Sequence, residues 1–186
     1  YLDLDFIEIL YRTFFNRASD SEGQNYWLAQ IHLGTSRTEI IKRFINSNEW
    51  ATICAQYGIA SGGTGKVTPS KATTDFVTRL YTKCLGRNAS TSDVDYWAQK
   101  LATKELSGSQ VAQKFFFGSE FTGKKYSNEE FVKRLYRTCM NREPSSSDVT
   151  YWVNKLKSGT SRQALFNSFV SKAEFVNLCK NAGINP

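Results

Sequence analysis

The fold of this chain is decided by residues 76–97, which read FVTRLYTKCLGRNASTSDVDYW. Residues 6–27 read FIEILYRTFFNRASDSEGQNYW, and residues 131–152 read FVKRLYRTCMNREPSSSDVTYW. In each stretch an Arg lies 11 residues after the first Phe, and the Tyr-Trp pair begins 9 residues after that Arg. A spacing kept without insertion or deletion predicts one structural unit used three times. The chain therefore reads as an array that presents a surface, not as a single-copy enzyme core.

Each copy predicts the same helices. Apolar residues recur at i, i+4 and i+8, as at Phe76, Leu80 and Cys84, which is one face of a helix. The residues that follow favour the left-handed conformation that ends a helix: Asn16, Gly86 and Asn141. A second helix is predicted to start at Asp20, Ser90 and Ser145, and a third at Ser36, Ser107 and Ser161. Capping boxes are predicted at Ser90–Asp93, Ser145–Asp148, Ser36–Glu39 and Ser107–Gln110.

Copies one and three continue into a fourth helix that ends near Gly58 and Gly183, whereas the middle copy breaks at residues 122–125 and is expected to lack it. Residues 60–73 have the Gly, Ser and Thr composition of a flexible linker. We therefore predict an all-α bundle of three repeats, each about 50 residues long, in two lobes. Repeat 1 (1–59) forms lobe 1, and repeats 2 (74–126) and 3 (127–186) together form lobe 2.

Charge is distributed unevenly along the chain. The net charge of +7 combines −2 in residues 1–59 (5 Lys/Arg, 7 Asp/Glu) with +9 in residues 60–186 (19 and 10). Basic residues alternate with acidic and Ser residues, which favours solvated helix faces over a nucleic-acid surface. Polyanion binding by the basic lobe remains a third alternative, and it would weaken steeply with salt. No stretch approaches the roughly 20 apolar residues of a membrane-spanning helix, so we expect no membrane insertion.

The side chains needed for common catalytic sites are scarce. His32 is the only histidine, so a nucleophile–base pair has a single candidate base. No metal-binding cysteine or calcium-loop spacing occurs. The Gly-rich residues 62–66 depart from a phosphate-binding loop at Ala60 and Val67. We expect a protein that is not an enzyme and that binds no metal or cofactor.

Aromatic side chains make up 14% of the residues and supply the candidate binding groups. Trp27 and its equivalents fall on the apolar stripe, while Tyr26 and its equivalents lie at its edge, followed four residues later by Gln30, Lys100 or Lys155. A tyrosine ring can stack on the apolar face of a sugar while neighbouring polar groups bind its hydroxyls. The candidate carbohydrate-binding residues are Tyr26, Trp50, Tyr96, Trp97, Tyr151, Trp152, Lys100 and Lys155, with Tyr57, Phe116, Phe117 and Tyr126 as further aromatics. Burial in the core is the competing interpretation for each aromatic.

Several motifs resemble a known family. They are Phe76 to Tyr81, Arg87 and Tyr96-Trp97 in repeat 2, their counterparts from Phe131 to Trp152, and Ser171 to Phe175. They are similar to the extracellular bacterial helical repeats known as domain-of-unknown-function family 4214, which is distantly similar to phycobilisome linker domains. The resemblance covers nearly the whole chain. It implies a secreted or cell-surface bacterial protein, and similar helical modules occur in surface proteins that hold starch.

Two functional hypotheses follow. The first is a non-catalytic carbohydrate-binding module that takes a polysaccharide or oligosaccharide, with α-glucan such as starch as the favoured ligand. The alternative is a structural or protein-interaction repeat that docks or spaces other modules of the parent protein. We expect no nucleic-acid partner.

The four cysteines recur at equivalent positions. Cys84 and Cys139 lie on first helices, and Cys54 and Cys179 lie on fourth helices. One interpretation is four buried free thiols. The alternative is two disulfides, Cys139–Cys179 within repeat 3 and Cys54–Cys84 between repeats 1 and 2, which a secreted setting permits.

Overall fold

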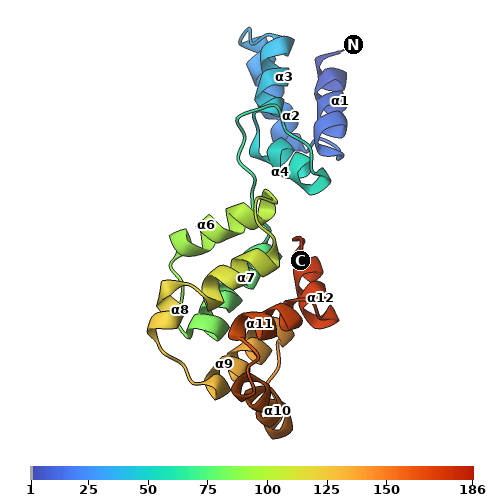
Figure 1. Cartoon of the computed structure of the whole chain (residues 1–186). Coiled ribbons are helices and arrows are strands. Elements are labelled where there is room, and N and C mark those ends of the chain that lie inside the picture. Colours follow the sequence, from blue (N-terminus) through green and yellow to red (C-terminus); the bar gives the residue numbers. More distant parts are fainter. Residues whose placement is uncertain (1) are drawn as a thin grey trace. The chain divides into compact units, whose positions relative to one another are not determined.

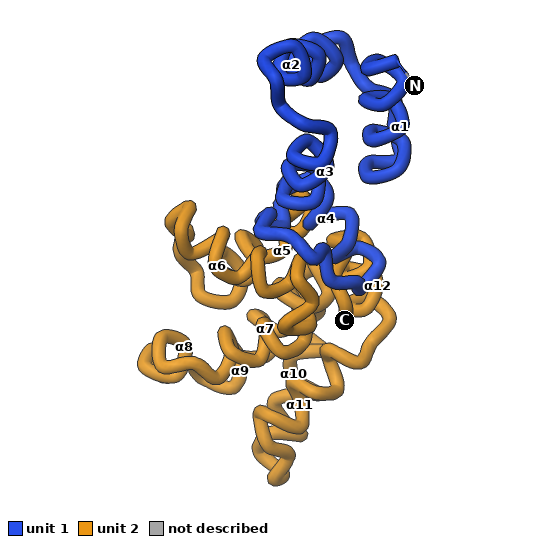
Figure 2. Tube along the Cα trace, turned by 90° about the horizontal axis from the view of Figure 1, so that it is seen from above, with its two compact units in different colours: residues 1–68 blue, residues 69–186 orange. Residues whose placement is uncertain are grey.

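The computed structural model describes residues 2–186, which fold into helices joined by short turns, with no strand among them (Figure 1). The all-α prediction is therefore confirmed. The chain divides into two compact units, unit 1 at residues 1–68 and unit 2 at residues 69–186 (Figure 2).

Unit 1 contains repeat 1. Its helices are α1 (Asp3–Phe15), α2 (Ser21–His32), α3 (Arg37–Ile45) and α4 (Asn48–Tyr57). Its core gathers around Phe44, which is 1% exposed. The Phe44 ring stacks on Phe15 at 5.0 Å between centroids and meets Trp27 at 5.1 Å. The buried residues around it are Ile7, Leu10, Tyr11 and Ile40.

Unit 2 contains repeats 2 and 3. Repeat 2 comprises α5 (Lys71–Arg79), a π-helical segment η1 (Leu80–Leu85), α6 (Thr91–Ala102), α7 (Gly108–Phe116) and α8 (Ser119–Gly123). Repeat 3 comprises α9 (Asn128–Leu135), a π-helical segment η2 (Tyr136–Met140), α10 (Ser146–Lys157), α11 (Arg162–Val170) and α12 (Ala173–Asn181). One continuous hydrophobic core runs through both repeats. The two repeats therefore fold as one body.

Most helix ends lie where local side-chain chemistry predicts them. Asn16, Gly86 and Asn141 adopt φ angles of 53°, 71° and 52°, the left-handed conformation. The capping boxes at Ser90, Ser107 and Ser145 form with both reciprocal bonds. The predicted box at Ser36 is only half formed, because Ser36 Oγ accepts from Glu39 N while the Glu39 carboxylate lies near Lys42 and Arg43.

The middle repeat differs from the sequence-based expectation in its fourth helix. It does form one, α8, although that helix has only five residues. Phe121 at its centre is 2% exposed and packs against Phe116, with ring centroids 5.2 Å apart. Lys125 just beyond takes a positive φ of 48°, which turns the chain toward repeat 3. Burial of one aromatic side chain therefore holds a turn of helix that the polar sequence after it cannot extend.

The segment expected to be a flexible linker is instead hydrogen-bonded to the end of α3 and to α4. Three backbone N–H groups donate to side chains of unit 1: Thr64 to Asn46 (3.0 Å), Lys66 to Asn48 (2.7 Å) and Thr68 to Thr52 (2.8 Å). Exposure alternates from residue to residue along 61–68, as in an extended strand lying on a surface. A Cβ at Gly63 or Gly65 would collide with the carbonyl oxygen of Ile45 or Ser47, so the close approach requires glycine. The linker is also shorter than expected, because α5 begins at Lys71.

All four cysteines are free and buried in the structure, so neither alternative disulfide is present. Burial raises the pKa of the Cys84 and Cys139 thiols, and it raises the pKa of Cys179 to about 12. Because the thiolate is the reactive form, we expect no labelling of the native protein by a thiol reagent at neutral pH. After denaturation without a reductant, a chromogenic thiol assay should count four thiols per chain. A count of two or zero would show that bridges form.

Candidate functional site

The repeated tyrosine of the first helix and the repeated tryptophan of the second are hydrogen-bonded to each other. Trp97 Nε1 donates to Tyr81 Oη at 3.2 Å, and Trp152 Nε1 donates to Tyr136 Oη at 3.1 Å. Trp97 also packs against Phe115, with ring centroids 5.5 Å apart. These contacts join the helices of each repeat. Trp97 and Trp152 are thus partly buried structural anchors, and little of either ring is left to stack on a ligand.

The repeated arginine lies over the face of the same tyrosine. The guanidinium carbons of Arg17, Arg87 and Arg142 lie 4.8, 4.7 and 4.7 Å from the ring centroids of Tyr11, Tyr81 and Tyr136. This cation–π contact explains why the spacing from Tyr to Arg is six residues in every copy. The fixed spacing of this arginine is visible in the sequence, but its contact with the tyrosine ring is visible only in the structure.

In the first two repeats the arginine also binds a carboxylate of the last helix with two hydrogen bonds. Arg17 donates to Glu49 at 2.7 and 3.1 Å, and Arg87 donates to Glu120 at 2.7 and 2.9 Å. In repeat 3, Arg142 is instead 3.6 Å from Asp148, and no ion pair joins it to Glu174 among residues 2–186. The arginine therefore ties the fourth helix to the first in repeats 1 and 2 only.

The Arg87–Glu120 pair gives a pH-dependent prediction. The two hydrogen bonds from Arg87 hold the pKa of Glu120 below its ordinary value. Because the folded-state pKa is depressed, the stabilisation is present above the unfolded pKa and is lost as pH falls through the folded pKa. We expect Glu120→Gln to lower the free energy of unfolding by about 0.5–1 kcal/mol at neutral pH, since the pair is partly exposed.

That difference should disappear as the pH is lowered well below the ordinary glutamate value of 4.5. Urea titrations of both proteins across this range would measure it. Glu174→Gln is the matched control, because this equivalent glutamate is exposed and makes no ion pair with Arg142. A Glu120→Gln effect that persisted unchanged in acid would contradict the assignment.

The second tyrosine of each repeat is exposed. Tyr26, Tyr96 and Tyr151 are 51%, 56% and 54% exposed, although the tryptophan next to each is partly buried. Each ring meets the edge of that tryptophan, with centroids 4.9, 5.0 and 4.9 Å apart. In each of the three repeats, the packed indole therefore holds a half-exposed phenol ring in the same orientation. We call these three side chains the tyrosine platform.

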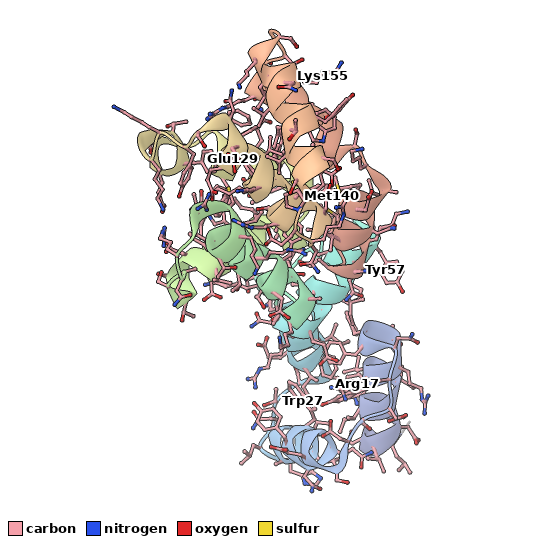
Figure 3. All side chains as sticks on the ribbon, turned by 90° about the horizontal axis from the view of Figure 1, so that it is seen from below. Arg17, Trp27, Tyr57, Glu129, Met140 and Lys155 are labelled. Atoms are coloured by element: carbon pink, nitrogen blue, oxygen red, sulfur yellow. The ribbon has the colours of Figure 1, made fainter. Side chains whose placement is uncertain are left out.

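The predicted lysines lie over two of these rings. Lys100 Nζ is 5.1 Å from the centroid of Tyr96, and Lys155 Nζ is 5.7 Å from that of Tyr151. Figure 3 shows Lys155 projecting from α10. The i, i+4 spacing on a helix brings each pair together, as the sequence predicted. In repeat 1 the equivalent residue is Gln30, whose side-chain oxygen accepts a hydrogen bond from Arg43 at 3.1 Å.

Tyr96 borders a shallow hollow of about 480 Å³ on the outer face of α6. Its other lining residues are Ser92, Asp95, Gln99, Lys100, Thr103 and Glu105. Lys100 Nζ donates to Glu105 at 2.6 Å, and this bond raises the pKa of Lys100. The hollow thus combines an aromatic ring with hydroxyl, amide, ammonium and carboxylate groups.

The other candidates do not join this hollow. Trp50 is held in unit 1, where its Nε1 donates to Ser61 O at 2.8 Å and its ring meets Phe14 at 5.0 Å. Trp97 borders a separate hollow of about 180 Å³ beside Glu120. Tyr96 on α6 and Tyr151 on α10 belong to opposite ends of unit 2 (Figure 1), so one sugar ring cannot reach both. The structure therefore offers separate small sites.

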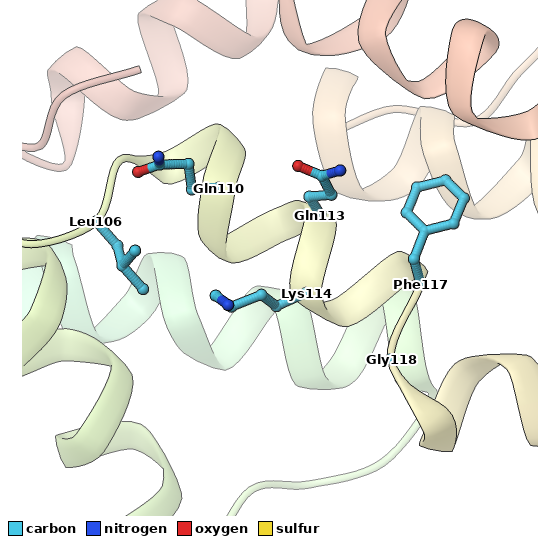
Figure 4. Close-up of a pocket in the computed structure, with 6 residues that line it drawn as sticks. All are labelled: Leu106, Gln110, Gln113, Lys114, Phe117 and Gly118. Carbon is cyan, nitrogen blue, oxygen red and sulfur yellow. The ribbon is translucent and has the colours of Figure 1, made fainter.

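A larger hollow of about 540 Å³ lies along α7 (Figure 4). It is lined by Leu106, Gln110, Gln113, Lys114, Phe117 and Gly118. Gln110 Oε1 accepts the capping bond from Ser107 N at 2.8 Å, and Phe117 packs on Phe166 with centroids 5.5 Å apart. Because these side chains already have structural contacts, we rank this hollow below the tyrosine platform.

Among the described residues, no group of three or more His, Cys, Asp or Glu side chains is arranged to hold a metal ion. His32 is exposed at the last position of α2. No helix in residues 2–186 has both the length and the apolar composition needed to cross a bilayer.

Comparison with known proteins gives one family. A model described as a domain of unknown function, DUF4214, matches residues 2–54, 66–124 and 112–179. No curated protein and no solved structure matches the chain. The three matches correspond to the three repeats and together cover most of the sequence. The chain therefore belongs to the DUF4214 family, as three consecutive copies of its repeat.

Proposed function

We propose that this protein is a non-catalytic polysaccharide-binding module in which Tyr26, Tyr96 and Tyr151 are the contact residues. The observation that carries the proposal is the repeated exposure of these rings, at 51%, 56% and 54%. A ring that only stabilised the fold would gain more from burial, because burying apolar surface contributes about 25 cal/mol per Å². Half-exposed rings in three equivalent places favour a surface that stacks on a ligand.

The surroundings of Tyr96 favour a sugar as that ligand. A pyranose has apolar C–H faces that stack on an aromatic ring, and equatorial hydroxyls that need hydrogen-bond partners. Lys100, Glu105 and Asp95 lie around the same hollow and can supply such partners. A long apolar ligand would leave these charged groups desolvated, which is unfavourable.

The three separate rings of the tyrosine platform suit a ligand with a repeating structure. Each site is a small open surface, and its affinity for one sugar unit is expected to be weak. A polysaccharide can occupy two or three sites at once, and the later contacts then form at a high effective concentration. We favour α-glucan because similar helical modules occur in surface proteins that hold starch. The same similarity favours a secreted or cell-surface location in a bacterium.

Affinity electrophoresis in gels containing starch, glycogen, xylan or mannan tests the proposal. We expect at least one polysaccharide, starch first, to retard the wild-type chain. The triple variant Tyr26→Ala/Tyr96→Ala/Tyr151→Ala should migrate as in a gel without polysaccharide, since all three stacking surfaces are gone. The corresponding triple Phe variant should retain most of the retardation, because the rings remain.

Leu33→Ala is the matched control, since it removes an apolar side chain that is 80% exposed outside the platform. Wild-type mobility unchanged in every gel, or full retardation of the triple Ala variant, would refute the proposal. Added salt should change the retardation little. A steep loss with salt would favour polyanion binding by the basic second half of the chain.

A structural or interaction role is the second candidate. It is favoured by a different observation, the large apolar side chains that unit 1 leaves exposed: Leu2, Leu4, Ile9, Leu33, Tyr57 and Ile59. Exposed apolar side chains that gather on one face can mark an association surface.

A further inference from the structure

Repeats 2 and 3 pack on each other reciprocally. Phe76 of repeat 2 meets Phe175 on the last helix of repeat 3, with ring centroids 6.2 Å apart. Phe131, the equivalent of Phe76, meets Phe121 on the last helix of repeat 2 at 6.1 Å. Each repeat thus places its first helix against the last helix of the other. The arrangement is that of a two-fold dimer built within one chain.

Polar contacts between the same two repeats reinforce this arrangement. Arg134 Nη1 donates to Cys84 O at 2.6 Å, across the contact between the two repeats. Thr73 Oγ1 donates to Ala182 O at 3.0 Å, and Gly108 N donates to Asn185 O at 2.8 Å. As a result Ala182 and Ile184 are only 4% and 5% exposed. Each repeat uses its first helix and its last helix for this contact, and we call the surface that they form its pairing face.

In unit 1 the pairing face has no second repeat of the same unit against it. Tyr57 and Ile59 hold the positions of Ala182 and Ile184, yet they are 75% and 57% exposed. Ile9 holds the position of Arg79 and Arg134 and is 45% exposed. Phe6 is partly buried, whereas its equivalents Phe76 and Phe131 are 3% and 0% exposed. The 61–68 segment runs beside α4 and leaves Ile9, Tyr57 and Ile59 uncovered.

We propose that unit 1 pairs with unit 1 of a second copy of this chain, through the pairing face formed by Phe6, Ile9, Trp50, Tyr57 and Ile59. An isologous contact needs two vacant pairing faces. In unit 2 both faces are already used against each other. Repeat 1 has no partner repeat within its own unit, so a second copy of unit 1 is the partner that supplies the matching face. The dimer then contains three repeat pairs.

The side chains of unit 1 suit such a contact. Ile9 replaces the arginine that crosses between the repeats in unit 2, so the unit 1 face is more apolar at this position. Residues 1–68 contain 6 Lys/Arg and 7 Asp/Glu, a net charge of 6 − 7 = −1. Two copies therefore meet with little charge repulsion. The exposed Tyr57 ring supplies the large rigid contact that is typical of protein interfaces.

Sedimentation velocity of the full chain over a concentration series tests the proposal. We expect the wild type to approach twice the mass of one chain as concentration rises. The double variant Tyr57→Asp/Ile59→Asp should keep the mass of a single chain at every concentration. Both side chains are exposed, so the variant should keep the helical circular-dichroism signal of the wild type. Leu33→Asp, an equally exposed apolar position outside the pairing face, should still dimerise.

Three outcomes would overturn the proposal. One is a wild type that stays monomeric at every concentration, which would mean that the face is covered within the chain. Another is a dimer that survives the double Asp variant. The third is growth beyond the dimer, which would mean a head-to-tail contact in place of a two-fold one.

Discussion

Replacing Phe131 with alanine is expected to lower the free energy of unfolding of unit 2 by about 3–5 kcal/mol, the range for a fully buried phenylalanine. Phe131 is 0% exposed. Its ring is surrounded by three aromatic rings of repeat 2, with centroid distances of 5.8 Å to Phe116, 6.4 Å to Phe117 and 6.1 Å to Phe121. The cavity would therefore open at the contact between the repeats, and both should lose stability together.

Urea denaturation combined with hydrogen exchange measured by mass spectrometry would assign the loss to each unit. Phe6→Ala is the matched control, because Phe6 is the same residue of the repeat but is only partly buried. At concentrations where the chain is monomeric, this variant should affect unit 1 alone, and by less than half as much. Equal losses of unfolding free energy for Phe131→Ala and Phe6→Ala would contradict the difference in burial between the two side chains. Loss confined to repeat 3 would contradict the shared core of unit 2.

Helix boundaries could be predicted from the sequence because their causes are local. Ser90 and Ser145 act within three residues of themselves, through bonds to the N–H groups of Asp93 and Asp148. The fourth helix of repeat 2 was missed because its cause is tertiary packing. The Phe121 ring is buried among Phe116 and Tyr126 of its own repeat and Phe131 of repeat 3, and the sequence of residues 119–123 does not show that these rings meet.

The 61–68 segment also shows a limit of prediction from sequence, because a segment predicted to be flexible is hydrogen-bonded in the structure. Its Gly and Thr residues are typical of a flexible linker. Its backbone bonds, however, are made to Asn46, Asn48 and Thr52, which precede it by 16–18 residues. Composition reports how freely a segment could move in isolation. It does not report whether a neighbouring helix offers acceptors at matching intervals.

The candidate site was predictable in part. Tyr96 and Lys100 share one helix at i, i+4, so their proximity follows from helical geometry. The structural role of Trp97 depends on Tyr81, 16 residues earlier on a different helix. The pairing face was not foreseen at all, because it is defined by contacts between repeats. In unit 1 the equivalent positions Ile9, Tyr57 and Ile59 are exposed.

A second large change in stability is expected on substitution of Arg134, whose surroundings differ from those of the equivalent Arg79. Arg134 Nη1 donates to Cys84 O at 2.6 Å, and its guanidinium lies 4.1 Å from the ring centroid of Tyr126. Its Nε lies 2.8 Å from Glu130 Oε1, in an orientation that makes an ion pair rather than a hydrogen bond. The side chain is 14% exposed, so all three contacts are shielded from solvent.

Arg134→Met is therefore expected to destabilise unit 2 by about 2–3 kcal/mol, since it removes charged hydrogen bonds and leaves Glu130 without this partner. Arg79 holds the same position in repeat 2, but among the described residues no carboxylate pairs with it, and burial lowers its pKa. A partly buried charge with no such partner opposes folding, so Arg79→Met should be neutral or stabilising. Urea titration of the two variants at neutral pH measures the contrast. Similar losses from both would mean that partners outside these contacts stabilise the two arginines equally, because methionine largely preserves the packing of the aliphatic stem. That result would exclude an electrostatic difference between Arg134 and Arg79 as the cause of the change in stability.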